Sequence, residues 1–158
     1  IYIETLFDKI CTELQYSENS SLVDIVLDIN KQMNFYGDKS RLKIIFSNLI
    51  SNALRYADLR KQQPQVKVIA QINEKEVVIK VQDNGQGIKK EHQQKIFDMF
   101  YRANSYRNGS GLGLYILKES VKKINGSVQV ESEYGVGSTF TVSFPQIIST
   151  QKEIASVN

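Results

Sequence analysis

The sequence has little of what marks secreted, membrane-spanning or nucleic-acid-binding chains. Cys11 is the only cysteine among 158 residues, which excludes an intrachain disulfide and fits a reducing, cytoplasmic compartment. There is no run of about eighteen apolar residues and no leader peptide pattern, so we expect no membrane span, no signal peptide and no membrane contact by this domain. The 20 Lys and Arg are scattered among 17 Asp and Glu, so we expect no nucleic-acid partner.

What is present suffices for one domain. With 41% hydrophobic residues, a chain of this length can bury one core. We expect a domain over residues 1–146 and a polar tail over residues 147–158. Because the sequence starts with Ile1 rather than Met, we expect a piece of a longer protein, in which any membrane anchor belongs to other segments.

Hydrophobic periodicity predicts an α+β fold. Apolar residues at helical spacing predict helices over residues 2–16, 40–57 and 112–124, with Asp38 or Ser40 as the cap of the second. A short helix is expected soon after the last central strand. Alternating apolar runs predict strands, some of them paired as hairpins. The expected strands cover residues 22–29, 65–72, 75–82, 127–133 and 137–144.

Two asparagines interrupt the apolar second helix, in the stretch FSNLISNALRY. Asparagine inside a helix costs roughly 0.6 kcal/mol relative to alanine, so a function should offset it. Asn48, Asn52 and Arg55 fall on one shoulder of the apolar stripe. An amide oxygen suits Mg²⁺, which commonly shares its coordination with phosphates; Arg55 would face the same phosphates, and Tyr56 would offer an aromatic face. The alternative is a solvated polar row beside a core helix.

The stretch DNGQG, residues 83–87, ends a predicted strand. Asp83 continues the inward parity of the strand's apolar residues, so its carboxylate should point toward the core side. A buried carboxylate needs donors, and the exocyclic amino group of adenine is one. Gly85 and Gly87 would let the ring lie against bare backbone. The alternative is an Asx-turn that closes the strand.

The stretch RNGSGLGLYI, residues 107–116, places Gly109, Gly111 and Gly113 at the start of a helix. Free backbone N–H groups and the helix dipole favour phosphate there. The glycines follow a polar loop rather than a strand and lack a Gly-Lys-Ser/Thr ending, so neither a dinucleotide fingerprint nor a P-loop is present. The alternative is a flexible glycine-rich linker.

The order of these motifs is specific. NLISNALRY, DNGQGI, IFDMFYR, GSGLGLYI and EYGVGSTFTVSFP follow one another, and together they resemble the ATP-binding catalytic domain of sensor histidine kinases, within the group that includes gyrase, heat-shock protein 90 and mismatch-repair ATPases. The resemblance covers about residues 1–146. It implies the two-layer α/β sandwich of the Bergerat fold, with a mixed, mostly antiparallel sheet of about five strands and three main helices on one face.

The resemblance also implies ATP and Mg²⁺ as cofactors and a role for each motif residue. Asn52 would ligate Mg²⁺, and Asp83 would recognise the adenine amino group. Either Ser138 or Thr139 would complete the base site through water. The loop from about residue 101 to 110 would be a mobile lid. The other implied nucleotide contacts are Asn48, Arg55, Tyr56, Gly85, Gly87, Ile88, Gly109, Gly111, Leu112 and Gly113, with Phe97 and Phe100 as lid anchors and Arg102 or Arg107 reaching the γ-phosphate.

Two partners follow from the same resemblance. Such kinases phosphorylate a histidine on a helical hairpin placed before this domain, and the phosphate goes on to a response regulator receiver domain. Nothing in this sequence resembles the hairpin. His92 is the only histidine, and its context predicts a solvated surface residue rather than an acceptor.

Two alternative functions stay open. One is an ATP hydrolase of the same fold; relatives of that kind place a glutamate one turn before the metal-binding asparagine, whereas this chain has Asn48, whose amide cannot take a proton at neutral pH. The other is a module that binds nucleotide without catalysis. A lost aspartate or glycine would mark that module, and all are present.

Overall fold

The computed structural model describes residues 2–32, 34–103 and 111–146. The predicted tail and most of the predicted lid, residues 104–110, lie outside the described residues. The helices are α1 (Ile3–Glu13), α2 (Lys39–Arg55), α3 (Lys90–Gln93) and α4 (Gly113–Lys123), and the strands are β1 (Asp24–Lys31), β2 (Gln65–Ile72), β3 (Glu76–Asp83), β4 (Ser127–Glu133) and β5 (Gly137–Pro145).

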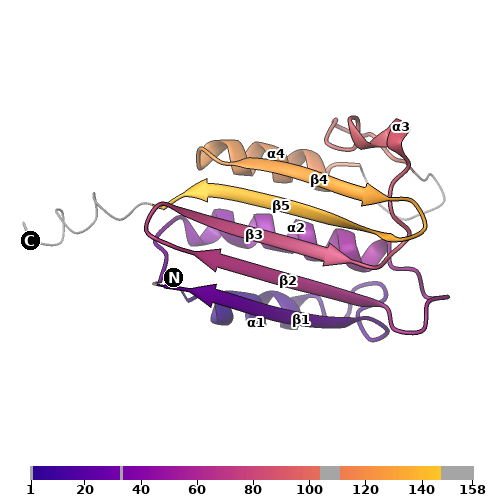
Figure 1. Ribbon diagram of the computed structural model, residues 1–158, viewed down its shortest axis with the longest axis horizontal. Coiled ribbons are helices and arrows are strands. Elements are labelled where there is room, and N and C mark those ends of the chain that lie inside the picture. Colours follow the sequence, from indigo (N-terminus) through magenta and orange to yellow (C-terminus); the bar gives the residue numbers. More distant parts are fainter. Residues whose placement is uncertain (1, 33, 104–110, 147–158) are drawn as a thin grey trace, which may run out of the picture.

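The strands form one mixed sheet in the order β1-β2-β3-β5-β4. β1 and β2 pair in parallel, and every other neighbouring pair is antiparallel. The three longer helices lie behind one face of the sheet, with α2 in the middle, while the short α3 lies beyond the end of β4 (Figure 1). The predicted two-layer sandwich with a mostly antiparallel sheet is therefore confirmed.

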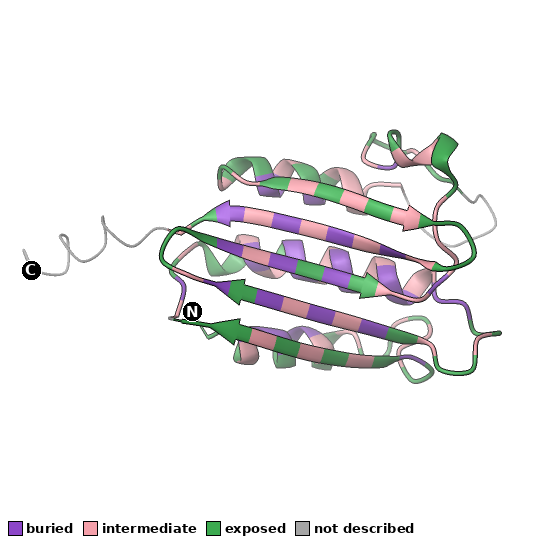
Figure 2. Ribbon diagram, in the orientation of Figure 1, coloured by how far each residue is buried: buried purple, intermediate pink, exposed green. Residues whose placement is uncertain are grey.

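The core lies between the sheet and these helices. Buried residues alternate with less buried ones along β2, β3 and β5 (Figure 2), as expected for strands with one face turned to the helices. The apolar stripe of α2 supplies much of the other side, including Phe46 and Leu49, each 1% exposed. Burial of this apolar surface orients both layers, so the polar shoulder of α2 necessarily faces sideways, along the sheet.

Most predicted elements agree with the structure within a few residues. Asp38 rather than Ser40 caps α2, because its side chain accepts a hydrogen bond from the N–H of Arg41 at 3.0 Å. β1 lies two residues later than predicted, since its pairing with β2 runs from Asp24 opposite Gln65 to the ends of both strands. None of the described helices combines the length and apolarity that crossing a membrane requires.

Candidate functional site

A cleft opens between α2, α4 and the end of the sheet, and two adjoining pockets form it. The helix-side pocket, about 310 Å³, lies between the polar shoulder of α2 and the start of α4. The strand-side pocket, about 340 Å³, lies at the end of β3. Each volume is of the order found for small-molecule sites. Residues that line both pockets are Asn52, Tyr56, Ile96, Tyr101, Arg102 and Leu114.

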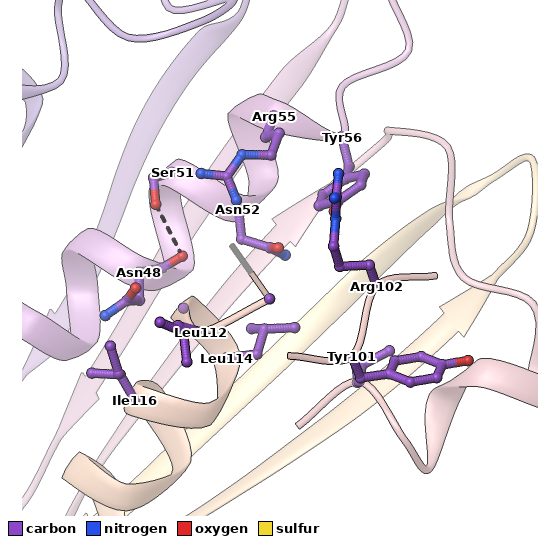
Figure 3. A pocket seen from close by; sticks show the side chains of 13 residues that line it. Asn48, Ser51, Asn52, Arg55, Tyr56, Tyr101, Arg102, Leu112, Leu114 and Ile116 are labelled. Atoms are coloured by element: carbon purple, nitrogen blue, oxygen red, sulfur yellow. Dashed lines mark hydrogen bonds between the residues drawn. The ribbon is translucent and has the colours of Figure 1, made fainter. Parts of the chain in front are cut away.

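The polar row of α2 faces the helix-side pocket, as the helical spacing predicts. Asn48, Asn52 and Arg55 of α2 line this pocket together with Leu112 and the start of α4 (Figure 3). The side-chain N–H of Asn48 donates to the carbonyl oxygen of Ile44 at 2.9 Å, which leaves Oδ1 to face Gly113. Among the described residues, the amide of Asn52 has no hydrogen-bond partner, so its oxygen can accept a ligand.

Asp83 lies at the bottom of the strand-side pocket, where β3 ends. Its Oδ1 accepts a hydrogen bond from the N–H of Gly85 at 2.9 Å, which is the Asx-turn weighed as an alternative. The side chain of Asp83 also lies on the buried face of β3, as the alternation of the strand predicts. The Asx-turn and an inward-facing carboxylate therefore occur together. Burial raises the pKa of Asp83 to about 6, although backbone N–H groups of Gly85 and Ser138 and the charge of Lys61 act in the opposite direction.

The glycines after Asp83 are required by the chain's own backbone. A Cβ added at Gly85 would lie 2.5 Å from the carbonyl oxygen of Tyr56, and one added at Gly87 would lie 2.1 Å from that of Glu133. Gln86 fixes the same loop, because its N–H donates to the oxygen of Tyr56 at 3.0 Å. The loop therefore packs directly against α2 and against the β4–β5 turn, residues 134–136, which places Gly87 and Ile88 in the wall of the pocket.

The glycine turn before α4 closes the other end of the cleft. Gly111 has φ +75°, and a Cβ there would lie 2.7 Å from the carbonyl carbon of Phe100. The N–H of Phe100 donates to the oxygen of Gly111 at 2.9 Å. Gly111, Leu112 and Gly113 line the helix-side pocket, so the amino end of α4 faces the polar row of α2. Two further predicted contacts, Arg107 and Gly109, lie outside the described residues.

The strand period separates the two candidates at the base site. Ser138 is buried and lines the strand-side pocket, whereas Thr139 lines neither pocket because it points to the opposite face of β5. The hydroxyl of Ser138 lies 2.8 Å from that of Ser132, which also accepts the N–H of Ile88 at 2.8 Å. Ser132, which the sequence motifs do not mark, is thus part of this hydroxyl pair.

Three other predicted residues lie outside the lining of both pockets. Gly85 acts through the loop that it shapes. Phe97 packs edge-on against Phe140, with ring centroids 6.2 Å apart. It therefore anchors to the core the segment that leads up to residue 103. Phe100 is 64% exposed and contributes mainly through its backbone bond to Gly111.

His92, predicted to be a solvated surface residue, is less exposed than that prediction implies. Its side chain is half-buried, lines the strand-side pocket and hydrogen-bonds through Nδ1 to the hydroxyl of Tyr101. No sequence signal joins two residues nine positions apart across an irregular segment. The pocket residues that were not among the predicted contacts also include Ser51, Gln86, Lys89, Ile96, Tyr101, Ala103, Leu114, Ile116 and Tyr134.

The donors in the cleft suit a shared metal ion rather than a protein-only metal cage. The part of the chain that the structure describes contains no group of three His, Cys, Asp or Glu placed to hold a metal. The amide oxygens of Asn48 and Asn52 are hard ligands, and Mg²⁺ typically takes only one or two protein ligands beside water and phosphate oxygens. The amide row of the cleft offers such ligands, whereas the arginines and the amino end of α4 suit the phosphates that would share the ion.

Known proteins resemble the chain in sequence and in structure. The family described as histidine kinase-, DNA gyrase B-, and HSP90-like ATPase matches residues 37–148. Sensor protein SrrB of Staphylococcus aureus is 32% identical over 148 residues, which cover 91% of this chain and 25% of SrrB. The chain thus spans about a quarter of the curated relatives it matches.

Solved structures confirm the fold. The mycobacterial sensor histidine kinase MprB has a TM-score of 0.76 at 22% identity, covering 92% of this chain and 95% of MprB. Full-length ShkA, solved in complex with AMPPNP, has a TM-score of 0.79 at 24% identity, covering 94% of this chain and 31% of ShkA. The catalytic domain of histidine kinase ThkA has a TM-score of 0.75 at 21% identity, covering 91% of this chain and 94% of ThkA.

Proposed function

The chain belongs to the family of histidine kinase-, DNA gyrase B- and HSP90-like ATPases, and we propose that it binds Mg²⁺-ATP in the cleft and donates the γ-phosphate to a histidine on a separate domain. Within the family it is an ATP-binding catalytic domain of the sensor histidine kinase type, as the sequence predicts. One observation carries the proposal. A single cleft joins the Asp83 carboxylate at one end to the amino end of α4 at the other, with Asn52 lining both parts.

The base occupies the strand-side pocket in this proposal. The oxygen Oδ2 of Asp83 accepts a hydrogen bond from the adenine amino group, while Oδ1 keeps its bond to Gly85. Ser138 lies beside this carboxylate and offers a hydroxyl to the base or to a bridging water. Tyr56 and Ile88 supply the apolar faces that exclude water. Guanine carries a carbonyl where adenine carries its amino group, so this arrangement selects adenine.

The phosphates occupy the helix-side pocket. The amino end of α4 and the guanidinium of Arg55 offer positive potential there, and Arg102 lies where the two pockets meet. Asn52, whose amide oxygen accepts no hydrogen bond within the described chain, would hold Mg²⁺. When bound, that ion neutralises charge on the phosphate oxygens as the phosphoryl group leaves.

The cleft provides position and charge but no base for water. Asn48 faces Gly113 from the turn before Asn52, and an amide does not accept a proton at neutral pH. Transfer therefore requires an incoming nucleophile, for which we propose the histidine of a phosphoacceptor hairpin, supplied in cis or in trans. A response regulator receiver domain would then take the phosphate from that histidine.

The test separates binding from transfer. Calorimetry should show that the chain binds Mg²⁺-ATP and ADP. The Asp83→Asn variant should bind both nucleotides about tenfold or more weakly, because the amide N–H of the new asparagine then faces the adenine amino group. Incubation with γ-labelled ATP should leave the isolated chain unlabelled, and a phosphoacceptor hairpin of a sensor histidine kinase added in trans should gain acid-labile label. Rapid phosphate release by the isolated chain would instead support the hydrolase alternative.

A further inference from the structure

Lys61 connects the Asp83–Gly87 loop to the β4–β5 turn, although it lies outside every motif of the sequence. It follows α2, in the loop before β2. Its ammonium donates to the carbonyl oxygen of Gly85 at 3.1 Å and to that of Val136 at 2.7 Å. Gly85 belongs to the Asp83–Gly87 loop and Val136 to the β4–β5 turn, so one side chain holds three segments that are far apart in sequence.

A closed turn fixes the backbone from which Lys61 extends. The N–H of Lys61 donates to the carbonyl oxygen of Asp58 at 3.1 Å. The Asp58 carboxylate accepts the N–H of Arg60 at 3.1 Å and two guanidinium bonds of 2.9 and 3.0 Å. Asp58 itself is 7% exposed. These hydrogen bonds fix the backbone of Lys61. Binding of its side chain to the two carbonyl oxygens therefore costs less conformational entropy than it would from a mobile loop.

Gly85 links Lys61 to the carboxylate that would read the base. The oxygen of Gly85 accepts the Lys61 ammonium, and its N–H donates to Oδ1 of Asp83 at 2.9 Å. The same positive charge lowers the pKa of Asp83, against the larger rise that burial causes. Lys61 therefore acts on both the orientation and the charge of Asp83 without lining the pocket.

We propose that Lys61 is a positioning residue for base recognition: it holds the Asp83–Gly87 loop against the β4–β5 turn so that the Asp83 carboxylate faces the base in its ionised form. The inference rests on the proposed function, because it deepens the role given there to Asp83. The role is not catalytic, since the ammonium is bound to two carbonyl oxygens rather than to the cleft.

Other ionisable groups also face Asp83 and must stay constant in any test. The lining of the strand-side pocket includes basic side chains from the segment after Ile88 and from the segment that leads up to residue 103, and three tyrosines. These groups are Lys89, His92, Arg102, Tyr56, Tyr101 and Tyr134. Histidine is the only one of these residue types whose ordinary pKa lies near 6 to 7, so a His92→Gln background leaves Asp83 as the group that the measurement follows.

The first experiment needs no nucleotide. Carboxyl-carbon NMR of the intact chain follows Asp83 from pH 4 to 8 in the His92→Gln background, with Lys61 present or replaced by Met, which keeps the apolar stem of the side chain and removes its charge. We expect the Asp83 midpoint to rise by roughly half a pH unit in Lys61→Met, and the Gly85 amide to exchange faster with solvent. Lys61→Arg should restore most of both signals.

Lys80→Met is the matched control. Lys80 lies on β3 three residues before Asp83 but is exposed on the opposite face, so its replacement changes net charge equally without touching the loop. An Asp83 midpoint that moves as far in Lys80→Met as in Lys61→Met, or that moves in neither, would overturn the proposal.

The second experiment measures ADP affinity by calorimetry at pH 6 and pH 8 in the same variants. Relative to the chain with Lys61 present, we expect Lys61→Met to lose about twofold more ADP affinity at pH 6 than at pH 8. A half-unit rise of the midpoint lowers the ionised fraction of Asp83 at pH 6 from about one half to about one quarter, whereas at pH 8 Asp83 is ionised in both proteins. An equal loss at both pH values, with the NMR midpoint unmoved, would leave Lys61 a merely structural role. Failure of the unmodified chain to bind nucleotide, with the midpoint shifted as expected, would reject the proposed function and keep the positioning of Asp83.

Discussion

Gly87 lies directly against the carbonyl oxygen of Glu133, which is only 2.1 Å from the position that a Cβ on Gly87 would take. Gly87 also has φ +71°, a conformation that residues with a Cβ rarely adopt. Two independent constraints therefore require glycine at the junction between the Asp83–Gly87 loop and the β4–β5 turn. The junction forms one wall of the strand-side pocket.

Gly87→Ala should consequently separate the loop from the turn. We expect the free energy of unfolding to fall by about 3 kcal/mol, of which about 1 kcal/mol is the cost of the left-handed backbone and the rest comes from the clash. Urea denaturation at neutral pH measures this loss. Nucleotide affinity should fall as well, because the wall of the pocket moves.

Gly135→Ala is the control for the backbone cost. Gly135 has φ +86° but nothing lies within 4 Å of an added Cβ, so only the conformational penalty of about 1 kcal/mol applies. Equal losses of stability in Gly87→Ala and Gly135→Ala would show that the approach to Glu133 contributes nothing.

The pKa of Asp83 makes both stability and binding depend on pH. The folded-state pKa of about 6 lies above the ordinary value of 3.8, so the folded chain holds this proton more tightly than the unfolded chain. The contribution of Asp83 to stability is therefore largest below pH 3.8 and is lost as the pH rises toward 6. The loss amounts to about 3 kcal/mol and stays constant at higher pH.

Asp83→Asn should therefore raise the unfolding free energy by about 3 kcal/mol at pH 7.5 while weakening nucleotide binding. Nucleotide binding by the unmodified chain should decline as the pH falls below about 6, since the ionised carboxylate accepts the adenine amino group more strongly than the protonated acid does. Urea denaturation and calorimetry across this range measure the two effects. Asp28→Asn, on the exposed edge of β1, should change neither; a stability gain of the same size there would assign the effect to net charge.

The motifs predict the placement of side chains well where local geometry carries the information. Helical spacing places Asn48, Asn52 and Arg55 on one face, and strand parity turns Asp83 inward, because both periods are fixed by the backbone. The assignment of Ser138 and Thr139 needs the register of β5, and parity counted from the buried Phe140 would resolve it.

Contacts between distant segments are what the sequence leaves undetermined. The bonds from Lys61 to Gly85 and Val136 span 24 and 75 residues, and the His92–Tyr101 bond crosses an irregular segment. No periodicity reaches over such separations. The glycines show the same limit: their pattern predicts close approach, but only the fold reveals that Tyr56 and Glu133 are the groups approached.

Replacement of Asn52 tests the metal assignment. Its amide oxygen is the proposed Mg²⁺ ligand, so Asn52→Ala should weaken ATP binding about tenfold in the presence of Mg²⁺. Binding of ADP in excess chelator should change less than about twofold, because no metal then contributes. Calorimetry with and without Mg²⁺ gives the comparison.

Asn30→Ala provides the matched control, since Asn30 is an exposed asparagine on β1, away from the cleft. It should behave as the unmodified chain in both conditions. If Asn52→Ala lowered affinity equally with Mg²⁺ and with chelator, Asn52 would contact the nucleotide itself and the metal would have to be held elsewhere.

His92 should not accept phosphate, although it is the only histidine and lines the cleft. It lies in the strand-side pocket, beside the proposed base, whereas the phosphates are proposed to lie in the helix-side pocket, which His92 does not line. Its Nδ1 is bound to the hydroxyl of Tyr101, and its Nε2 lies 3.5 Å from Oε1 of Glu91. Nδ1 is therefore engaged by Tyr101, and the imidazole lies away from the pocket proposed for the γ-phosphate.

Incubation of the isolated chain with γ-labelled ATP and Mg²⁺ should therefore give no acid-labile label, and Tyr101→Phe, which frees Nδ1, should give none either because the separation between the pockets remains. His92→Gln should still support labelling of a phosphoacceptor hairpin added in trans. Label on His92 in the Tyr101→Phe chain alone would show that the hydrogen bond, rather than the placement of the imidazole beside the base, keeps this residue from reacting.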